Sequence, residues 1–302
     1  FLLLLFDYMF FGEIAALITA LLWSVSSIVF SEASVRIGSQ QLNMNRLLFA
    51  AFFLAALVLF MGFPESVTAE QIWFLFLSGF AGLVFGDGFL FKSFHMIGAR
   101  YSMLIMSFVP GISALLGYLF LDEVLSLQSI IGILVTIAGI AMVVIEKKSG
   151  NSKFKITGLG FVYGFLGALG QAVGLLLAKN AFVLGEINEF SATFVRIISS
   201  IIILFPFMII LRKYKNPVKL YRKDTTALYL TIAGSIIGPF LGITFSLIAI
   251  SHTEVGIAST LMSTTPILML PMVKFYYKEK IPVTGILGAF IAVCGIAILF
   301  LR

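Results

Sequence analysis

Charged residues are scarce in this sequence: they make up 11% of its 302 residues, whereas hydrophobic residues make up 60%. A soluble domain of this length carries roughly 25% charged residues and about 45–50% apolar residues. A soluble core could not bury this much apolar surface, and disorder requires low hydrophobicity together with high charge. The composition, with a mean hydropathy of +1.11, therefore predicts an all-α polytopic membrane protein.

Cysteine and histidine are almost absent as well. Cys294 is the single cysteine, and His95 and His252 are the only histidines. These counts exclude an intrachain disulfide and argue against a zinc site. No glycine-rich loop is followed by the Lys and Ser or Thr of a nucleotide-binding motif. We therefore expect no metal, no cofactor and no enzymatic activity.

The formal net charge of +6 raises the possibility of a nucleic-acid partner. The basic residues, however, lie in short loops between apolar runs, which is how membrane proteins distribute them. We therefore expect a lipid bilayer and a small-molecule substrate as partners, no nucleic acid, and a monomer or a homodimer.

Apolar runs long enough to cross a membrane follow one another along the chain. A helix needs about 20 such residues to span the hydrocarbon core. We predict ten transmembrane helices, near residues 11–31, 42–61, 71–91, 101–121, 127–145, 157–178, 190–211, 226–250, 256–275 and 283–301.

Lys and Arg are distributed unequally between the loops after odd-numbered helices and those after even-numbered helices. Outside these helices and the last residue, every Lys and Arg except Lys179 falls in the loops after helices 1, 3, 5, 7 and 9. The loop after helix 5 supplies Lys147, Lys148, Lys153 and Lys155. Because cytoplasmic loops are enriched in Lys and Arg, we expect the odd-numbered loops to lie in the cytoplasm.

The two halves of the chain resemble each other. Aligning 110–145 with 266–301 matches the following pairs: Pro110 with Pro266, Glu123 with Glu279, Ile130 with Ile286, Gly132 with Gly288, and Gly139-Ile140-Ala141 with Gly295-Ile296-Ala297. At slightly different offsets, Arg46 corresponds to Arg196 and Gly86 to Gly238. This self-similarity predicts two five-helix repeats, 1–148 and 149–302.

Five helices per repeat have a topological consequence. An odd number forces the second repeat to enter the membrane from the opposite side, which gives a 5+5 inverted-topology repeat. Secondary transporters are commonly built in this way, with the substrate site near the midplane between the halves. The repeat therefore indicates transport by alternating access.

Motifs along nearly the whole chain add a resemblance to a known family. They are Trp23, Arg46-Leu47-Leu48, the run from Gly86 to Phe94, Ile97-Gly98-Ala99, Pro110, Leu121-Asp122-Glu123, Gly132 and Gly139-Ile140. In this order they resemble the ten-helix, EamA-like branch of the drug/metabolite transporter superfamily. The resemblance implies a bacterial inner-membrane exporter of amino acids or other small metabolites. It also implies cytoplasmic termini, whereas the loop charges place both termini outside.

Arg46 and Arg196 are ionisable groups inside expected membrane helices, and such groups are functional candidates. Each could instead extend its charge to the interface along its flexible stem. As functional groups they would bind a carboxylate or phosphate, or form gate ion pairs. Because the repeat is inverted, we expect one arginine toward each face of the membrane.

Asp87 lies between Gly86 and Gly88 in a stretch with no other charge. Flanking glycines loosen a helix, and the matching place in the second half holds Gly238 and Pro239, where proline removes a helix hydrogen bond. Helices broken at matched positions are a sequence indication of a transporter binding site. We therefore predict helix breaks at these residues and a site close to them.

The role of Asp87 has two interpretations. It could carry a proton as coupling ion or bind a substrate amine, with Lys92 or His95 as its partner. It could also be an interfacial cap, because it lies about 16 residues into its helix.

Other polar residues are candidates for the substrate cavity or for gating. Trp23 and Ser27 lie on helix 1, Gln171 lies on helix 6, and Asn43 shares a helical face with Arg46. Lys179 either contacts an anionic substrate or pairs with Glu186 or Glu189. We expect Pro110 and Pro266 to kink helices 4 and 9.

These features favour a secondary active transporter that exports a small polar, amino-acid-like metabolite across the inner membrane. Two alternatives stay open at this point. One is the efflux of hydrophobic drugs or cations, and the other is an integral membrane enzyme acting on lipid-linked substrates.

Overall fold

The computed structural model describes residues 10–61, 67–144, 157–276 and 283–300, and the regular structure in these ranges is entirely helical. A hydrocarbon environment offers no hydrogen bonds to the backbone, so long apolar segments satisfy their own peptide groups as helices. The expected all-α architecture is confirmed. Some residues of the sequence analysis lie outside the described residues: Lys147, Lys148, Lys153, Lys155 and Glu279.

The helices of the first half are α2 (Phe11–Ile37), α3 (Ser39–Met61), α4 (Ala69–Gly79), the π-helix η1 (Phe80–Gly86), α5 (Asp87–Met106), α6 (Val109–Phe120) and α7 (Leu127–Val144). Those of the second half are α8 (Gly158–Val183), α9 (Glu189–Ile210), the short α10 (Pro217–Lys223), α11 (Thr225–Ser235), the π-helix η2 (Ile236–Gly242), α12 (Ile243–His252), α13 (Val255–Met262), α14 (Thr265–Tyr276) and α15 (Val283–Phe300). Polar side chains begin several of them, such as the capping box of Thr68 and Gln71 at α4.

Six helical stretches are long and apolar enough to cross a membrane: Phe11–Ile37, Ser39–Phe60, Ala69–Gly98, Gly158–Val183, Glu189–Ile210 and Thr225–His252. Shorter apolar helices occupy Val109–Phe120, Leu127–Met142, Val255–Met269 and Val283–Ile298. The chain is therefore a multi-pass membrane protein.

We also expect helix breaks at Pro110 and Pro266, and the structure has each proline at the beginning of a new helix instead of at a kink in a continuous one. α5 ends at Met106 and Pro110 is the second residue of α6, while Pro266 is the second residue of α14. Proline fits the first turn of a helix because the amide that it lacks has no intrahelical partner there. Expected helices 4 and 9 are thus each divided into two pieces.

The helix boundaries repeat with a constant shift. α4 and η1 begin and end 156 positions before α11 and η2, and α6 begins 156 positions before α14. The same shift pairs Gly86 with Gly242, each the last residue of a π-helix, so the expected correspondence of Gly86 with Gly238 is wrong by four residues. The insertion of α10 between α9 and α11 explains why the offset differs earlier in the chain.

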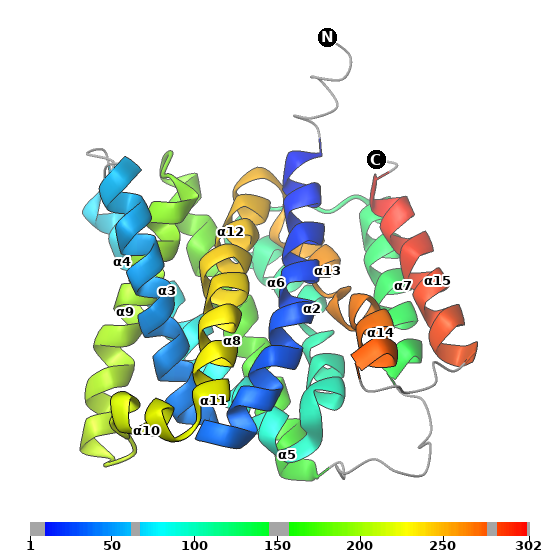
Figure 1. The fold of residues 1–302 in the computed structure, drawn as a ribbon. Helices are drawn as coiled ribbons and strands as arrows, with labels where there is room; N and C mark the ends of the chain where they lie inside the picture. Colours follow the sequence, from blue (N-terminus) through cyan, green and yellow to red (C-terminus); the bar gives the residue numbers. More distant parts are fainter. Residues whose placement is uncertain (1–9, 62–66, 145–156, 277–282, 301–302) are drawn as a thin grey trace.

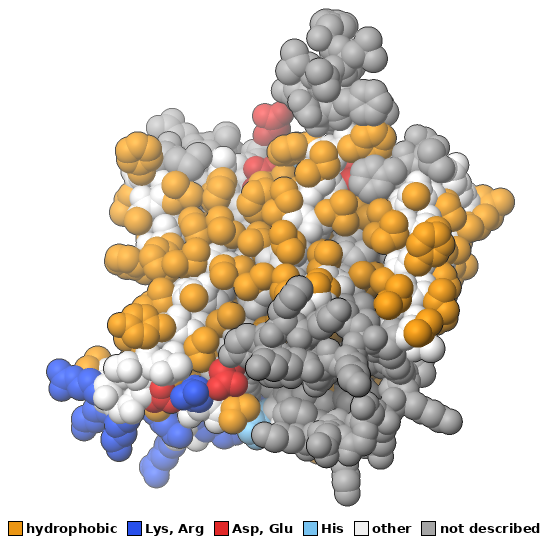
Figure 2. Space-filling view, turned by 45° about the vertical axis from the view of Figure 1, so that its right-hand side comes forward, with side chains coloured by type: hydrophobic (Ala, Val, Ile, Leu, Met, Phe, Trp, Pro, Cys, Tyr) orange, Lys and Arg blue, Asp and Glu red, His pale blue; other side chains and the backbone are white. Residues whose placement is uncertain are grey.

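The helices form one bundle with an apolar exterior. Figure 1 shows α2 and α12 in its middle, α3, α4 and α9 on one side, and α7 and α15 on the other. α7 and α15 pack closely because Gly139 and Gly295 have no side chain at their contact. In Figure 2 hydrophobic side chains cover the middle of the visible face, and Lys and Arg gather at the end where α10 lies.

Candidate functional site

A cavity of about 80 Å³ opens where the two halves meet. Its lining comes from α2, α3, η1 and α5 of the first half and from α8, α9, η2 and α12 of the second. Most of the expected site residues line it: Trp23, Ser27, Arg46, Asp87, Gln171 and Arg196. Both arginines line this one cavity, whereas we had expected them toward opposite faces of the membrane.

Arg46 and Asp87 form an ion pair in this cavity. Arg46 Nη2 lies 2.5 Å from Asp87 Oδ2, and only 6% and 14% of the two side chains are exposed. The expected partners Lys92 and His95 are wrong: Lys92 Nζ lies over the rings of Phe89 and Tyr163, and His95 is exposed. Five residues along a helix turn a side chain away from the face of Asp87, and eight residues place it about 12 Å further along the axis, while α3 brings Arg46 next to Asp87.

Three further residues hold the guanidinium of Arg46. Asn43 accepts a hydrogen bond from Arg46 Nε at 3.0 Å. The guanidinium carbon lies 4.7 Å from the ring centroid of Phe91 and 5.5 Å from that of Phe30, in cation–π contact with both. We did not expect these two rings, although Phe91 follows Asp87 by four residues and so shares its helical face.

Asn43 itself does not line the cavity. Its Nδ2 donates to the carbonyl oxygen of Leu83 at 3.1 Å, which ties α3 to the π-helix η1. Asn43 is therefore a supporting residue behind Arg46.

Arg196 has no such partners. Its residue is 1% exposed, its Nε makes no hydrogen bond, and no ion pair joins it to the described residues. Its Nη2 and the Gln171 Oε1 both lie next to Gly82: a Cβ placed there would be 3.2 Å from the first atom and 3.8 Å from the second. Arg196 nevertheless interacts electrostatically with the carboxylate of Asp87.

The two π-helices lie beside the cavity. Gly86 ends η1 against α8, where a Cβ would lie 3.1 Å from the backbone nitrogen of Gln171. Gly238 and Pro239 lie inside η2, and a Cβ on Gly238 would lie 2.9 Å from the ring of Phe30. At these positions the structure has a widened helical turn, of a kind that is frequent at functional sites.

Gly88 is not part of a break. It is the second residue of the regular helix α5, and nothing lies within 4 Å of a Cβ built on it. α5 is interrupted instead at Gly98, whose φ of 79° is in the region that favours glycine.

Lys179 lies away from the cavity. Its Nζ donates hydrogen bonds to the carbonyl oxygens of Ile250 at 2.6 Å and Thr253 at 3.1 Å. These carbonyls belong to the C-terminal end of α12, where a positive charge is favourable. Neither Glu186 nor Glu189 is its ion-pair partner among the described residues.

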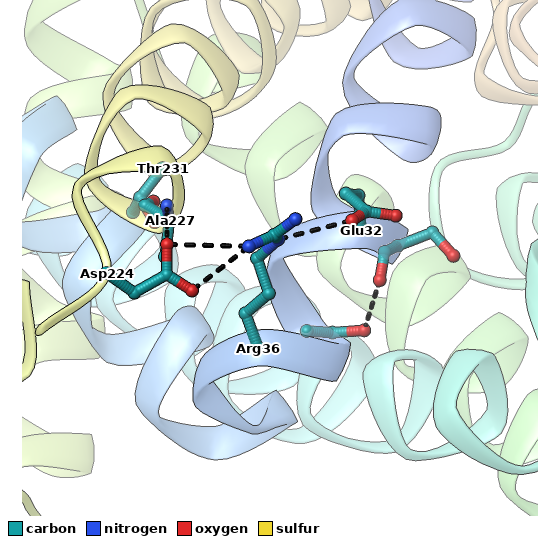
Figure 3. Close-up of polar contacts among 7 residues, drawn as sticks. Glu32, Arg36, Asp224, Ala227 and Thr231 are labelled. Carbon is teal, nitrogen blue, oxygen red and sulfur yellow. Dashed lines mark hydrogen bonds and ion pairs between the residues drawn. The ribbon is translucent and has the colours of Figure 1, made fainter. Parts of the chain in front are cut away.

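An exposed polar cluster joins the two halves at the end of the bundle where α10 lies. Figure 3 shows Arg36 between Glu32 and Asp224. Its Nε lies 3.2 Å from Glu32 Oε1 and its Nη1 lies 3.1 Å from Asp224 Oδ2. Asp224 also begins α11 by accepting the backbone N–H of Ala227, which, with Arg36, lowers its pKa. Exposed pairs of this kind contribute little to stability.

The described residues include no group of three or more His, Cys, Asp and Glu that could hold a metal ion. The cavity instead offers guanidinium, carboxylate, amide and hydroxyl groups with an aromatic wall. Such a set binds and orients a small polar solute. A helical membrane bundle with such a cavity between its halves has the architecture of a membrane transporter.

Comparison with known proteins places the chain in a family. The model of the EamA-like transporter family matches residues 10–145 and again residues 158–301. The protein belongs to the EamA-like transporter family, with its two-repeat architecture, and is a membrane transporter.

Two individual proteins are also similar to this chain. An uncharacterized transporter of Bacillus subtilis (strain 168), YxxF, is 30% identical over 127 residues, which is 42% of this chain. The match spans 39% of the length of that relative. A solved crystal structure superposes on 96% of both chains with a TM-score of 0.73 at 16% identity. At this identity the superposition shows the fold alone.

Proposed function

We propose that this protein is a secondary active transporter that exports a small polar, amino-acid-like metabolite by alternating access. The observation that carries the proposal is the polar cavity between the halves, with equivalent arginines of α3 and α9 lining it. A polar solute would exchange its water shell for these groups, and rocking of one half against the other would expose the cavity to each side in turn.

The proposal includes ten membrane crossings in a 5+5 inverted repeat. The constant shift between helix boundaries supports two equivalent units, and the apolar helices supply enough crossings when the shorter ones are counted. An odd number of crossings in each unit would invert the second relative to the first.

We place the end of the bundle that carries α10 in the cytoplasm of a bacterial cell. Lys and Arg gather there (Figure 2), and the positive-inside rule favours that side. The test uses Lys219→Cys and Glu186→Cys, each in a Cys294→Ser background and labelled with an impermeant maleimide. Lys219→Cys should react only after permeabilisation, and Glu186→Cys should react in intact cells; the reverse pattern would reverse the orientation.

Efflux of hydrophobic cations is less compatible with the cavity. Aromatic rings line it, but Arg46 already covers the faces of Phe30 and Phe91. Two guanidinium groups against one carboxylate would also repel a second cation.

The function is tested by metabolite profiling. Bacterial cells that express the wild type are compared with cells that express Arg46→Ala or the surface variant Asp122→Asn at equal membrane abundance. We expect a small set of polar metabolites to leave cells with the wild type and Asp122→Asn only. If all three strains show the same distribution inside and outside, the export proposal is wrong.

We propose protons as the coupling ion, with Asp87 as their carrier, because Asp87 is the single acidic side chain among the cavity-lining residues described. In proteoliposomes, Asp87→Asn should abolish transport driven by a pH gradient while substrate exchange without a gradient persists. Asp122→Asn should retain both. Gradient-driven transport that survives in Asp87→Asn would eliminate Asp87 as the carrier.

A further inference from the structure

Arg46 and Arg196 occupy equivalent places in the two halves. Each is the eighth residue of its helix, counted from Ser39 in α3 and from Glu189 in α9. Their surroundings differ in one respect. Asp87, the first residue of α5, pairs with Arg46, whereas the first residue of α12, the equivalent helix, is Ile243.

The cavity therefore contains two guanidinium groups and one carboxylate among its lining residues. Arg46 forms an ion pair with Asp87, whereas Arg196 forms no ion pair with the described residues, although the charge of Asp87 reaches it. A buried guanidinium without a partner is unfavourable, because it has lost its water and gained no anion in exchange. Yet Arg196 is 1% exposed, and no other function in the fold is visible for its guanidinium.

The charge that is missing beside Arg196 indicates the chemical class of the solute. A guanidinium binds a carboxylate or phosphate through two parallel N–H···O bonds. A solute with one negative charge would make the cavity lining neutral, and a carboxylate carries one such charge. A phosphate monoester instead carries a charge of about −1.5 to −2 at neutral pH. Gln171, whose Oε1 lies beside Gly82 as Arg196 Nη2 does, offers an amide to a neighbouring polar group of the same solute.

We propose that Arg196 is the carboxylate subsite of the cavity. The carboxylate of the solute takes the place beside Arg196 that the side chain at position 243 would take if the second half repeated the Arg46–Asp87 pair. The proposal deepens the proposed function and rests on it: it names the part of the transported metabolite that the protein recognises.

The test measures ligand-induced thermal stabilisation of the full chain in lipid nanodiscs. The probes are acetate, L-alanine and L-leucine, the amides L-alaninamide and L-leucinamide, and inorganic phosphate. We expect at least one carboxylate to raise the melting temperature at concentrations about tenfold below its amide or phosphate, a difference typical of one lost charged contact. Arg196→Gln should remove this preference.

Position 243 supplies a test that leaves Arg196 in place. Ile243→Asp provides the missing carboxylate within the protein, and Ile243→Asn is its uncharged control of the same size. Ile243→Asp should melt at a higher temperature than Ile243→Asn without ligand, and it should lose carboxylate binding. Ile243→Asn should bind the carboxylate within about threefold of the wild type, because it brings no competing charge.

Three results would overturn the proposal. The first is that no carboxylate stabilises the wild type more than its amide. The second is that phosphate is preferred. The third is that Ile243→Asp melts no higher than Ile243→Asn.

A failure of the subsite is distinguishable from a failure of the transport function. Carboxylate binding that depends on Arg196, without movement of that solute across proteoliposomes, would support the subsite and count against transport. Transport of a solute that has no carboxylate would support the transport function and count against the subsite.

Discussion

Asn43 joins α3 to the π-helix η1 through a hydrogen bond from its Nδ2 to the carbonyl oxygen of Leu83. Its Oδ1 accepts a hydrogen bond from Arg46 at the same time. The ion pair of Arg46 and Asp87 is therefore coupled to η1, where the helix is widened. A change in that pair would be transmitted directly to the backbone next to the cavity.

Removing one member of this pair should cost more than removing both. Asp87→Asn leaves Arg46 buried without an anion, and breaking a buried pair in this way destabilises by about 3 kcal/mol. In the double variant Arg46→Gln, Asp87→Asn no charge is left unpaired, and much of that loss should be recovered. A double-mutant cycle of thermal unfolding in detergent measures both. Additive effects of the two single substitutions would show that the pair contributes no coupling energy.

The site was predictable from sequence where charge and repetition coincided. Arg46, Arg196 and Asp87 are rare charges in apolar runs, and burial of such a charge indicates function. Their partners were not predictable, because an apolar helix in a membrane has no polar face to show which way each residue points. Phe30 and Phe91 are two of 32 phenylalanines, and only the packing of α2 against α5 shows that they contact Arg46.

The same lack of information on helix packing explains the sequence predictions that were wrong. The sequence predicts interruptions of the helices near Gly86 and Gly238, since glycine and proline weaken the regular hydrogen-bond pattern. Whether the interruption is a widened turn, a new helix start at Pro110, or no break at all at Gly88 depends on what packs against the backbone. Lys179 lay near acidic residues in sequence, but α12 brings its carbonyl oxygens closer.

Lys179 should act on stability and not on substrate affinity. Lys179→Met keeps most of the aliphatic chain and removes the two hydrogen bonds to the end of α12. Hydrogen bonds from a charged group contribute roughly 1.5–3 kcal/mol, so the melting temperature should fall. The concentration of transported solute that gives half-maximal rate should stay unchanged. A large increase in that concentration with an unchanged melting temperature would instead favour direct contact with the substrate.

Two glycines near the cavity should respond oppositely to alanine. Gly170 of α8 packs on η1 so closely that a Cβ would lie 2.7 Å from the Cα of Gly86 and from the Ala81 carbonyl oxygen. Gly170→Ala must therefore separate α8 from η1 and should lower both stability and transport. Gly88→Ala meets nothing within 4 Å and should stabilise α5 by about 0.5–1 kcal/mol through helix propensity. Thermal unfolding of both variants checks this, and equal effects of the two would contradict the close packing.

Glu123 should make stability depend on pH. Its carboxylate, in the loop between α6 and α7, accepts the backbone N–H of Val255 at 3.0 and 3.2 Å and so begins α13. Burial raises its pKa above the ordinary value of 4.5, and the Val255 hydrogen bond and the charge of Lys179 oppose that rise only in part. The folded protein thus holds this proton more tightly than the unfolded chain does.

The sign of the effect follows from proton linkage. A raised pKa in the folded state stabilises the protein fully below the unfolded pKa, and this contribution is lost as the pH rises through the folded pKa. Glu123→Gln has no proton to lose and can still accept the Val255 hydrogen bond. As the pH rises above the ordinary value of 4.5 and through the raised pKa of the folded protein, the melting temperature of the wild type should therefore fall relative to that of Glu123→Gln. Asp122→Asn, an exposed neighbour with a φ of 53° that asparagine also adopts, should follow the wild type. Parallel curves for the wild type and Glu123→Gln would mean that Glu123 stays ionised in the folded protein across this range, with its charge balanced by Lys179 and the start of α13.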